Sequence, residues 1–260
     1  MKNFAIKTIK EAGEIVRKKF GHIRNVKNKS RHLIDPVTEA DYLSEKKIVN
    51  AIKKQYPTHK ILSEESYHSA SLNEDDLWII DPLDGTRNFA VGIPFFCIAL
   101  SYKKKGQTVL DLVYDPLHNE LFFAAKGQGA YLNNKAIKVN KNTALSQSVV
   151  SYGATRRDFK VTREANRVLS RLSEAKCWLA NYGCAALGLC YLACGRTDIS
   201  FLYNLAPWDI DAAALIAEEA GARVEVYEAA AQNPWYKYRI LMANPRLFNK
   251  VKDKYIKLKF

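Results

Sequence analysis

The strongest constraint on the fold comes from one segment, which reads Trp78-Ile79-Ile80-Asp81-Pro82-Leu83-Asp84-Gly85-Thr86-Arg87-Asn88-Phe89. Its apolar start predicts a buried strand, and the proline and glycine that follow predict a sharp turn. The turn brings Asp81 and Asp84 close together. Neighbouring carboxylates raise each other's pKa unless a cation supplies positive charge. The segment therefore predicts a metal site, although an ordinary Asp-Gly turn with a helix-capping aspartate is the simpler alternative for these residues alone.

The length and composition of the chain are those of a globular protein. At 260 residues and 48% hydrophobic, it can bury a core in one compact unit or in two closely packed halves. Residues 1–20 predict an amphipathic helix without the cleavage site of an export signal. Its apolar face holds Phe4, Ile9, Ala12, Val16 and Phe20. No stretch approaches the roughly 20 apolar residues of a membrane span, so we expect a soluble protein with no membrane partner.

The cysteines indicate a reducing compartment. Their number is odd, and they are Cys97, Cys177, Cys184, Cys190 and Cys194. Buried free thiols in the cytoplasm explain this pattern best. The pair Cys190-x-x-x-Cys194 has no second pair or nearby histidines, so it does not predict a zinc site.

The net charge of +13 raises the question of a nucleic-acid partner. The lysines, however, are spread along the chain, and no recognisable nucleic-acid-binding motif accompanies them. The charge favours a solvated basic surface that also attracts a phosphorylated substrate. A nucleic-acid platform stays the alternative.

Residues 1–146 predict two helices followed by an antiparallel sheet, and they hold most of the candidate metal ligands. The second helix opens with a capping box, Thr38-x-x-Asp41. Its expected apolar stripe is Tyr42, Ile48, Val49, Ile52 and Tyr56. The expected strands are 61–62, 77–80, 95–102, 109–114, 121–125 and 130–132, with a tight reversal at Asn133-Asn134.

Residues 147–260 predict an α/β half, because strand and helix patterns alternate there. The expected strands are 149–150, 177–179, 199–202, 223–226 and 239–242, and the expected helices are 161–172, 185–194, 207–220 and a basic C-terminal helix. Pro207 suits the first turn of its helix, and Gly221 ends it. No linker separates the halves, so we expect them to pack as a single unit.

Further acidic residues stand where strands end or helices begin. Glu64 and Glu65 follow the strand at 61–62, Asp41 lies in the first turn of the second helix, and Asp209 follows Pro207-Trp208. A carboxylate in a first helical turn is stabilised by free amide groups and the helix dipole. Capping alone would therefore explain Asp41 and Asp209 taken one at a time.

Taken together, four motifs resemble the signatures of the inositol monophosphatase family, in the same order. They are Pro36-Val37-Thr38-Glu39-Ala40-Asp41, Ser63-Glu64-Glu65-Ser66, the segment 81–89, and Trp208-Asp209-Ile210-Asp211-Ala212-Ala213 with Glu219-Ala220-Gly221. Lesser matches are Gly127-Gln128-Gly129-Ala130-Tyr131 and Leu241-Met242-Ala243-Asn244-Pro245. The resemblance extends over nearly the whole chain.

The resemblance implies a fold of the α/β class, α+β in some schemes. This fold is a five-layered αβαβα sandwich like that of inositol monophosphatase and fructose-1,6-bisphosphatase. It also implies a Mg²⁺-dependent phosphomonoesterase that is sensitive to lithium, and a homodimer.

The resemblance further implies the metal ligands. Glu64, Asp81 and the backbone carbonyl of Leu83 would hold one Mg²⁺, and Asp81, Asp84 and Asp209 would hold a second. All of these donors are oxygens, which hard cations prefer. Two or three ions are expected in each site, and Mn²⁺ could replace Mg²⁺.

The implied catalytic residues are Glu64, Thr86 and Asp41. Thr86 and Glu64 would orient and deprotonate the attacking water, and Asp41 would support Thr86 through a hydrogen bond. The amides of Gly85 and Thr86 would bind the phosphate if they open a helix. The full set expected to contact substrate is Leu83, Asp84, Gly85, Thr86, Gly183, Cys184, Ala185 and Asp209.

On the substrate side, the sequence departs from its relatives. Leu202 stands where animal inositol monophosphatases carry a sugar-binding glutamate, Ala206 where a histidine is frequent, and Ala180 where an arginine is usual. Losing a charged hydrogen-bond acceptor could cost roughly 1.5 to 3 kcal/mol of binding, about ten- to a hundredfold. We expect a phosphatase whose preference is broader than, or different from, inositol phosphate. Sugar phosphates, nucleotides such as 3′-phosphoadenosines, NADP and histidinol phosphate stay open as substrates.

A second function stays open alongside the first. Some bacterial relatives act in transcription antitermination and ribosomal RNA maturation by binding RNA polymerase factors, and the basic charge permits such a role. The lysine that relatives carry ahead of the Thr-Glu-Ala-Asp element is assigned to Lys29.

Overall fold

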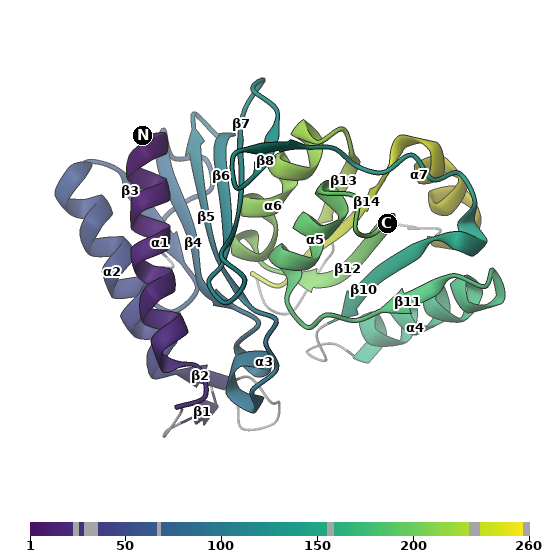
Figure 1. Ribbon diagram of the computed structural model, residues 1–260, viewed down its shortest axis with the longest axis horizontal. Coiled ribbons are helices and arrows are strands. Elements are labelled where there is room, and N and C mark those ends of the chain that lie inside the picture. The colour runs from purple at the N-terminus through teal and green to yellow at the C-terminus, as the bar shows by residue number, and fades with distance from the viewer. Residues whose placement is uncertain (23–25, 29–35, 67–68, 155–158, 229–234, 257–260) are drawn as a thin grey trace.

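The chain folds into five layers (Figure 1). The computed structural model describes residues 1–260 except 23–25, 29–35, 67–68, 155–158, 229–234 and 257–260. Helices α1 (Lys2–Lys19) and α2 (Glu39–Gln55) form one outer layer, a seven-stranded sheet the next, and α5 (Ala185–Ala193) with α6 (Pro207–Glu219) the centre. A five-stranded sheet follows, and α4 (Phe159–Glu174) with α7 (Pro245–Val251) forms the other outer layer. The expected αβαβα sandwich is confirmed.

The outer helix pair forms as its sequence predicts. Helix α1 buries Ile9, Ala12 and Val16 against the sheet, and its lysines lie outside. Helix α2 begins with the predicted capping box of Thr38 and Asp41. The expected stripe of α2 is wrong at Tyr42, whose side chain is 47% exposed, because polar residues share the buried face of the helix.

The first sheet has the order β3-β4-β5-β6-β7-β8-β9. Its strands are β3 (Lys60–Ser63), β4 (Asp76–Asp84), β5 (Cys97–Lys104), β6 (Gln107–Asp115), β7 (Glu120–Ala125), β8 (Ala130–Leu132) and β9 (Lys135–Ile137). Strand β3 pairs parallel with β4, so the expectation of an entirely antiparallel sheet is wrong at this edge. The predicted reversal is confirmed, since Asn133 and Asn134 connect β8 to β9 with φ values of 46° and 66°.

The predicted turn after Ile80 lies later than expected. Strand β4 continues through Asp84, and its register against β5 shifts between Asp81 and Asp84. The bulge accommodates Pro82, which cannot donate a ladder hydrogen bond. The chain turns only at Gly85, with φ at 89°, before the short helix α3 (Thr86–Val91). Asp81 and Asp84 therefore project from the end of a buried strand.

The second sheet has the order β11-β10-β12-β14-β13. Its strands are β10 (Val149–Ala154), β11 (Trp178–Ala180), β12 (Ile199–Leu205), β13 (Arg223–Glu228) and β14 (Tyr238–Ala243). Strand β10 pairs parallel with both β11 and β12, as the alternating pattern predicts, whereas β14 pairs antiparallel with β12 and β13. A π-helical turn, η2 (Lys252–Ile256), extends the basic C-terminal helix α7.

Four short elements were not expected from the sequence, and β9 is one of them. Strands β1 (Val26–Asn28) and β2 (Pro36–Thr38) pair antiparallel, and a 3₁₀ turn, η1 (Leu145–Gln147), precedes β10. Lys29 lies outside the described residues. Among the described helices, none combines the length and the apolar character needed to cross a bilayer.

Residues of α6 hold this central helix against the first sheet. Both Glu219 carboxylate oxygens accept hydrogen bonds, at 2.7 Å each, from the backbone amides of Gly127 and Gly129. Asp211 accepts a hydrogen bond of 3.0 Å from Lys103 on β5. The two sheets lie on either side of the boundary predicted at residue 146, and the division into halves there stays a prediction.

Candidate active site

Three acidic side chains from both halves converge between the sheets. Asp81 and Asp84 come from the end of β4, and Asp209 comes from the first turn of α6. One carboxylate oxygen from each lies within 4.8 Å of the others. Asp81 and Asp84 are buried, so folding removes two charged groups from water and places them next to each other.

The electrostatics of this cluster favour a cation. Burial, followed by the charges of Glu64, Asp84 and Asp209, raises the pKa of Asp81 well above its usual range. Burial also raises the pKa of Asp84, although hydrogen bonds to its carboxylate act in the opposite direction. A divalent cation would relieve both the repulsion and the lost hydration. Three carboxylate oxygens this close form a donor set that suits Mg²⁺, so the cluster could hold a metal ion.

Backbone amides fix the orientation of each acid. Asp81 Oδ1 accepts a hydrogen bond of 3.0 Å from the Leu83 amide, across the bulge. Asp209 Oδ2 accepts one of 2.7 Å from the Ala206 amide at the start of α6. Asp84 Oδ2 accepts one of 2.6 Å from the Ala186 amide in the first turn of α5. Both central helices therefore direct amide groups at this cluster.

Thr86 and Asp41 meet as the resemblance implies. The Thr86 hydroxyl lies 3.0 Å from Asp41 Oδ1 and 2.8 Å from the Leu83 carbonyl, with hydrogen-bond geometry to both. Asp41 Oδ2 also accepts hydrogen bonds of 2.8 and 2.6 Å from the Thr38 amide and hydroxyl. Burial raises the pKa of Asp41 to about 6 in spite of these bonds. Asp41 therefore caps α2 and supports Thr86 at the same time.

Gly85 and Asn88 hold α3 against the second half of the chain. A Cβ at Gly85 would lie 3.0 Å from the Phe95 carbonyl and 3.1 Å from the Cys184 Cβ, and its φ is positive. Asn88 Nδ2 donates hydrogen bonds of 2.7 Å to the carbonyls of Phe95 and Tyr182. The end of β4, the helix α3 and the start of α5 are therefore in close contact.

Glu64 lies beside the cluster. Its loop is held in place by Glu45, a residue that was not predicted from the sequence. The charge of Glu64 raises the pKa of Asp41, Asp81 and Asp84. Glu45, buried on α2, accepts hydrogen bonds from the Ser63 hydroxyl at 2.5 Å and from the Glu65 and Ser66 amides at 3.3 and 3.1 Å. Glu45 thereby fixes the loop on both sides of Glu64.

The signal for Glu45 was present in the sequence. Asp41, Glu45, Ile48 and Ile52 follow a helical spacing and share the buried face of α2. An acid on an apolar face requires a partner. Ser44, one position earlier, donates a hydrogen bond of 2.8 Å to the Pro82 carbonyl in the bulge.

We expect Glu45→Ala to weaken Mg²⁺ binding by about ten- to a hundredfold, the range typical of groups that orient metal ligands. Glu45→Gln keeps an acceptor oxygen and should retain more of the affinity. Calorimetric titration with Mg²⁺ measures the effect. Glu39→Ala is the matched control, because Glu39 lies on the same helix with its carboxylate exposed and paired with Lys19. Equal affinity in Glu45→Ala and Glu39→Ala would contradict the positioning role.

The expected substrate-side positions are largely apolar. Leu202 and Ala206 are buried in the apolar clusters next to α5 and α6, and Ala180 is half-buried at the end of β11. Cys184, expected to contact substrate, directs its thiol to Asp84 Oδ2 at 3.0 Å. Gly183 is exposed with φ at 68°, and Ala185 is half-buried. These positions present no charged side chain to a sugar hydroxyl.

Comparison with known proteins identifies the family of this chain. The family model described as "Inositol monophosphatase family" matches residues 1–257. The chain is 36% identical over 229 residues to Nus factor SuhB of Haemophilus influenzae, covering 88% of this chain and 86% of that protein. It is 38% identical over 230 residues to inositol monophosphatase 2 of Solanum lycopersicum, covering 85% and 84%.

Solved structures of similar proteins have the same fold. The extragenic suppressor protein suhB of Bartonella henselae is 30% identical, with a TM-score of 0.89 over 99% of this chain and 98% of that chain. The Thermotoga maritima IMPase is 32% identical, with a TM-score of 0.83 over 96% and 94%. The chain belongs to the inositol monophosphatase family.

Proposed function

We propose that this protein is a phosphatase that hydrolyses a small phosphate monoester with Mg²⁺. The observation that carries the proposal is the convergence of Asp81, Asp84 and Asp209 beside the hydrogen-bonded pair Thr86 and Asp41. Family membership supports it independently. We extend the proposal to inhibition by Li⁺ and to a cytoplasmic location, which the five unpaired cysteines support.

In this proposal Glu64, Asp81, the Leu83 carbonyl, Asp84 and Asp209 hold Mg²⁺, with Mn²⁺ as a substitute. The bound cations supply positive charge that neutralises phosphate oxygens and lowers the pKa of water.

The side chains of the chain itself orient the reaction. Thr86 positions the attacking water through its hydroxyl, whose direction Asp41 fixes, and Glu64 accepts the proton. The backbone at Gly85 and Thr86, together with Gly183, Cys184 and Ala185, borders the phosphate. The exclusion of solvent around the buried acids strengthens each of these interactions.

The substrate class is tested by phosphate release over a panel of inositol phosphate, sugar phosphates, 3′-phosphoadenosine, NADP and histidinol phosphate. The apolar environment of Leu202 and Ala206 predicts that inositol phosphate is not preferred by more than about tenfold over the best other ester. A strong preference for inositol phosphate would contradict this part of the proposal. Absence of release from every ester in Mg²⁺ and in Mn²⁺ would contradict the enzyme assignment.

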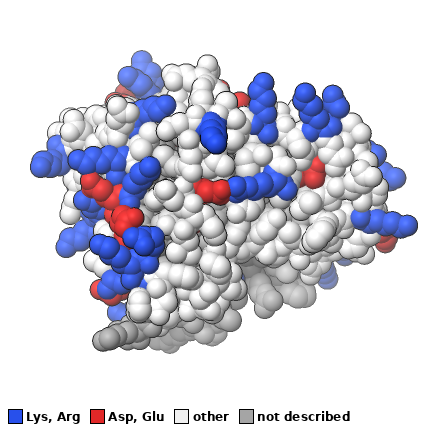
Figure 2. Space-filling model, in the orientation of Figure 1, with Lys and Arg blue, Asp and Glu red and all other residues white. Residues whose placement is uncertain are grey.

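A regulatory role in RNA synthesis is the second candidate. Several relatives bear the name Nus factor SuhB. Figure 2 shows lysines and arginines over the visible face, with a dense group over α1 and α2. Lys7, Lys46, Lys47 and Lys54 line a groove between these helices. Tight RNA binding that falls steeply with salt, and weakens in Lys46→Glu/Lys54→Glu, would favour this function.

We also propose a homodimer formed by an exposed apolar surface. Trp178 on the edge strand β11 is 75% exposed, and Val91, the last residue of α3, and Ile93 are also exposed. The Asn88 bond to Tyr182 and the stacking of Phe95 on Tyr182 bring these two segments together. Exposed apolar groups of this kind mark contact surfaces.

Trp178→Glu is expected to convert the dimer to a monomer, because a carboxylate buried in an apolar contact costs several kcal/mol. Light scattering coupled to size exclusion measures the mass. Val226→Glu is the matched control, since Val226 is an exposed apolar residue on β13, at the opposite edge of the same sheet. If the wild type is a monomer, or if Trp178→Glu is still a dimer, this surface is not the dimer interface.

A further inference from the structure

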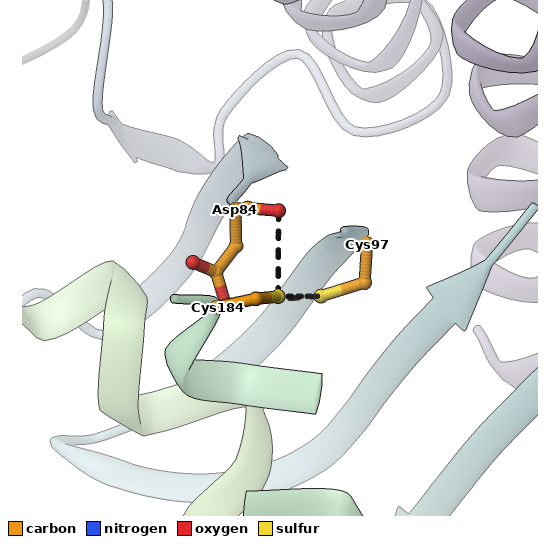
Figure 3. A group of neighbouring side chains, drawn as sticks. All are labelled: Asp84, Cys97 and Cys184. Carbon is orange, nitrogen blue, oxygen red and sulfur yellow. Dashed lines mark hydrogen bonds between the residues drawn. The ribbon is translucent and has the colours of Figure 1, made fainter. Parts of the chain in front are cut away.

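Two thiols lie beside the carboxylate of Asp84. Cys97 is the first residue of β5, and Cys184 immediately precedes α5. Their sulfur atoms are 3.7 Å apart, and Cys184 Sγ lies 3.4 Å from the backbone carbonyl oxygen of Asp84 (Figure 3). Asp84 Oδ2 lies 3.0 Å from Cys184 Sγ and 3.9 Å from Cys97 Sγ. One atom from each of the three residues lies within 4.8 Å of the others. The group therefore combines two soft donors with one hard donor.

The proposed hydrolysis does not use these sulfur atoms. Mg²⁺ binds oxygen and has little affinity for thiols, whereas Zn²⁺ and Cd²⁺ bind thiolates strongly. The two thiols therefore add sulfur donors that the cluster of Asp81, Asp84 and Asp209 does not contain.

The spacing of the three donors fits a tetrahedral ion. With Zn–S near 2.3 Å and Zn–O near 2.0 Å, two sulfurs in a tetrahedral site lie about 3.8 Å apart, and a sulfur and an oxygen lie about 3.5 Å apart. The sulfur separation of 3.7 Å matches the first value, and the two sulfur–oxygen distances of 3.0 and 3.9 Å lie on either side of the second. Side-chain shifts of a few tenths of an ångström would complete the geometry.

The surroundings of the sulfur atoms keep the group together. Both thiols are buried, with 0% exposure for Cys97 and 5% for Cys184. A Cβ at Gly85 would lie 3.1 Å from the Cys184 Cβ, so the glycine allows β4 and the start of α5 to approach closely. The hydrogen bond from the Ala186 amide to Asp84 then fixes the relative positions of the strand and the helix. A site built from two strands and a helix start is preorganised, which lowers the cost of binding.

We propose that Asp84, Cys97 and Cys184 form a binding site for a thiophilic divalent cation of the Zn²⁺ or Cd²⁺ type. Binding exchanges the two thiol protons for the metal ion and releases both protons to solvent. A fourth ligand position is left to water. Because Asp84 is shared, an ion held here withdraws it from the Asp81, Asp84 and Asp209 cluster and inhibits hydrolysis; this last consequence rests on the proposed function.

The experiment is a Cd²⁺ titration of the full-length protein in excess Mg²⁺, followed by the ultraviolet charge-transfer absorption of Cd²⁺–thiolate bonds. The wild type should give a saturable band with one ion per chain. Cys97→Ser and Cys184→Ser should each lose at least half of the band and bind Cd²⁺ at least tenfold more weakly. Serine is well tolerated before a helix, so Cys184→Ser should fold; Cys97→Ala provides a second variant at the other position.

The matched control is Cys177→Ser/Cys194→Ser, which removes two half-buried thiols outside the group. This variant should keep the band and its midpoint. A band that is absent from the wild type, is unchanged by Cys97→Ser and Cys184→Ser, or is lost in the control would overturn the site.

Activity provides a separate readout. Cd²⁺ should inhibit the wild type in a way that a chelator reverses, and at least tenfold more Cd²⁺ should be needed with Cys97→Ser. Equal sensitivity of the two proteins would overturn the link to hydrolysis. Since the absorption band needs no turnover, it tests the metal site even if no phosphoester proves to be a substrate.

Discussion

Asp84→Asn is expected to lower Mg²⁺-dependent phosphate release by about a hundred- to a thousandfold. The substitution keeps the size of the side chain but removes one negative charge from the three-carboxylate cluster. Asn also offers the Ala186 amide and the Cys184 thiol a weaker acceptor than the carboxylate does. Loss of one preorganised electrostatic contact to the transition state commonly has an effect of this size. Steady-state kinetics over a range of Mg²⁺ concentrations measures it.

Asp211→Asn is the control for this prediction. Asp211 belongs to the same sequence motif as Asp209, but its carboxylate lies 3.0 Å from Lys103 rather than in the cluster. Its replacement should change the rate by less than about threefold. If Asp84→Asn kept wild-type turnover, or if both variants lost activity equally, the assignment of the cluster as the catalytic metal site would be wrong.

The metal-free protein should lose stability as the pH rises from about 4 to about 6. Burial raises the pKa of Asp41 from 3.8 to about 6, so in this interval the folded chain holds a proton that the unfolded chain has released. The stability that this carboxyl contributes is complete below its unfolded pKa and is lost as the pH rises through its folded pKa. The difference of about two pKa units corresponds to roughly 3 kcal/mol. Asp81 and Asp84, whose pKa values are also raised, act in the same direction.

Mg²⁺ should restore stability above pH 6, by about 2.7 kcal/mol at a concentration one hundred times its Kd. Urea unfolding in chelator and in Mg²⁺, at pH 4.5 and pH 7, separates the two effects. Asp81→Asn removes a carboxylate whose pKa is raised well above its usual range, so it should be more stable than wild type in chelator at pH 7 and gain less from Mg²⁺. A metal-free wild type more stable at pH 7 than Asp81→Asn would contradict the repulsion within the cluster.

The sequence predicted the local elements well where one face of an element is apolar. Helix α1, the capping box of α2 and the reversal at Asn133 follow from short-range rules, because capping bonds and positive φ values depend on neighbouring residues. The extension of β4 through Pro82 was missed. A proline usually predicts the end of a strand. Here, pairing with β5 across a bulge keeps Pro82 in the sheet.

The aspartates of the candidate site were predictable from the sequence, whereas the residues that hold the site in place were less so. Asp41, Asp81, Asp84 and Asp209 stand out as charged residues next to apolar runs. Glu45 was overlooked because an acid within a helix usually faces solvent, and its three bonds to the Glu64 loop exist only after α2 packs against β3 and β4. The contact of the Cys184 thiol was also not predictable, since its acceptor Asp84 lies one hundred positions away in the chain.

By itself, the sequence determined the family, the order of the main helices and strands and the aspartates of the candidate site, since these depend on residue type and on spacing of a few positions. Only the tertiary structure decided which groups touch. It placed carboxylates from β4 and α6 within 4.8 Å of one another, buried Asp81 and Asp84 with raised pKa values, and set two thiols against the carboxylate of Asp84. The physical reason is that burial and charge repulsion act through space, between residues that the chain order keeps far apart.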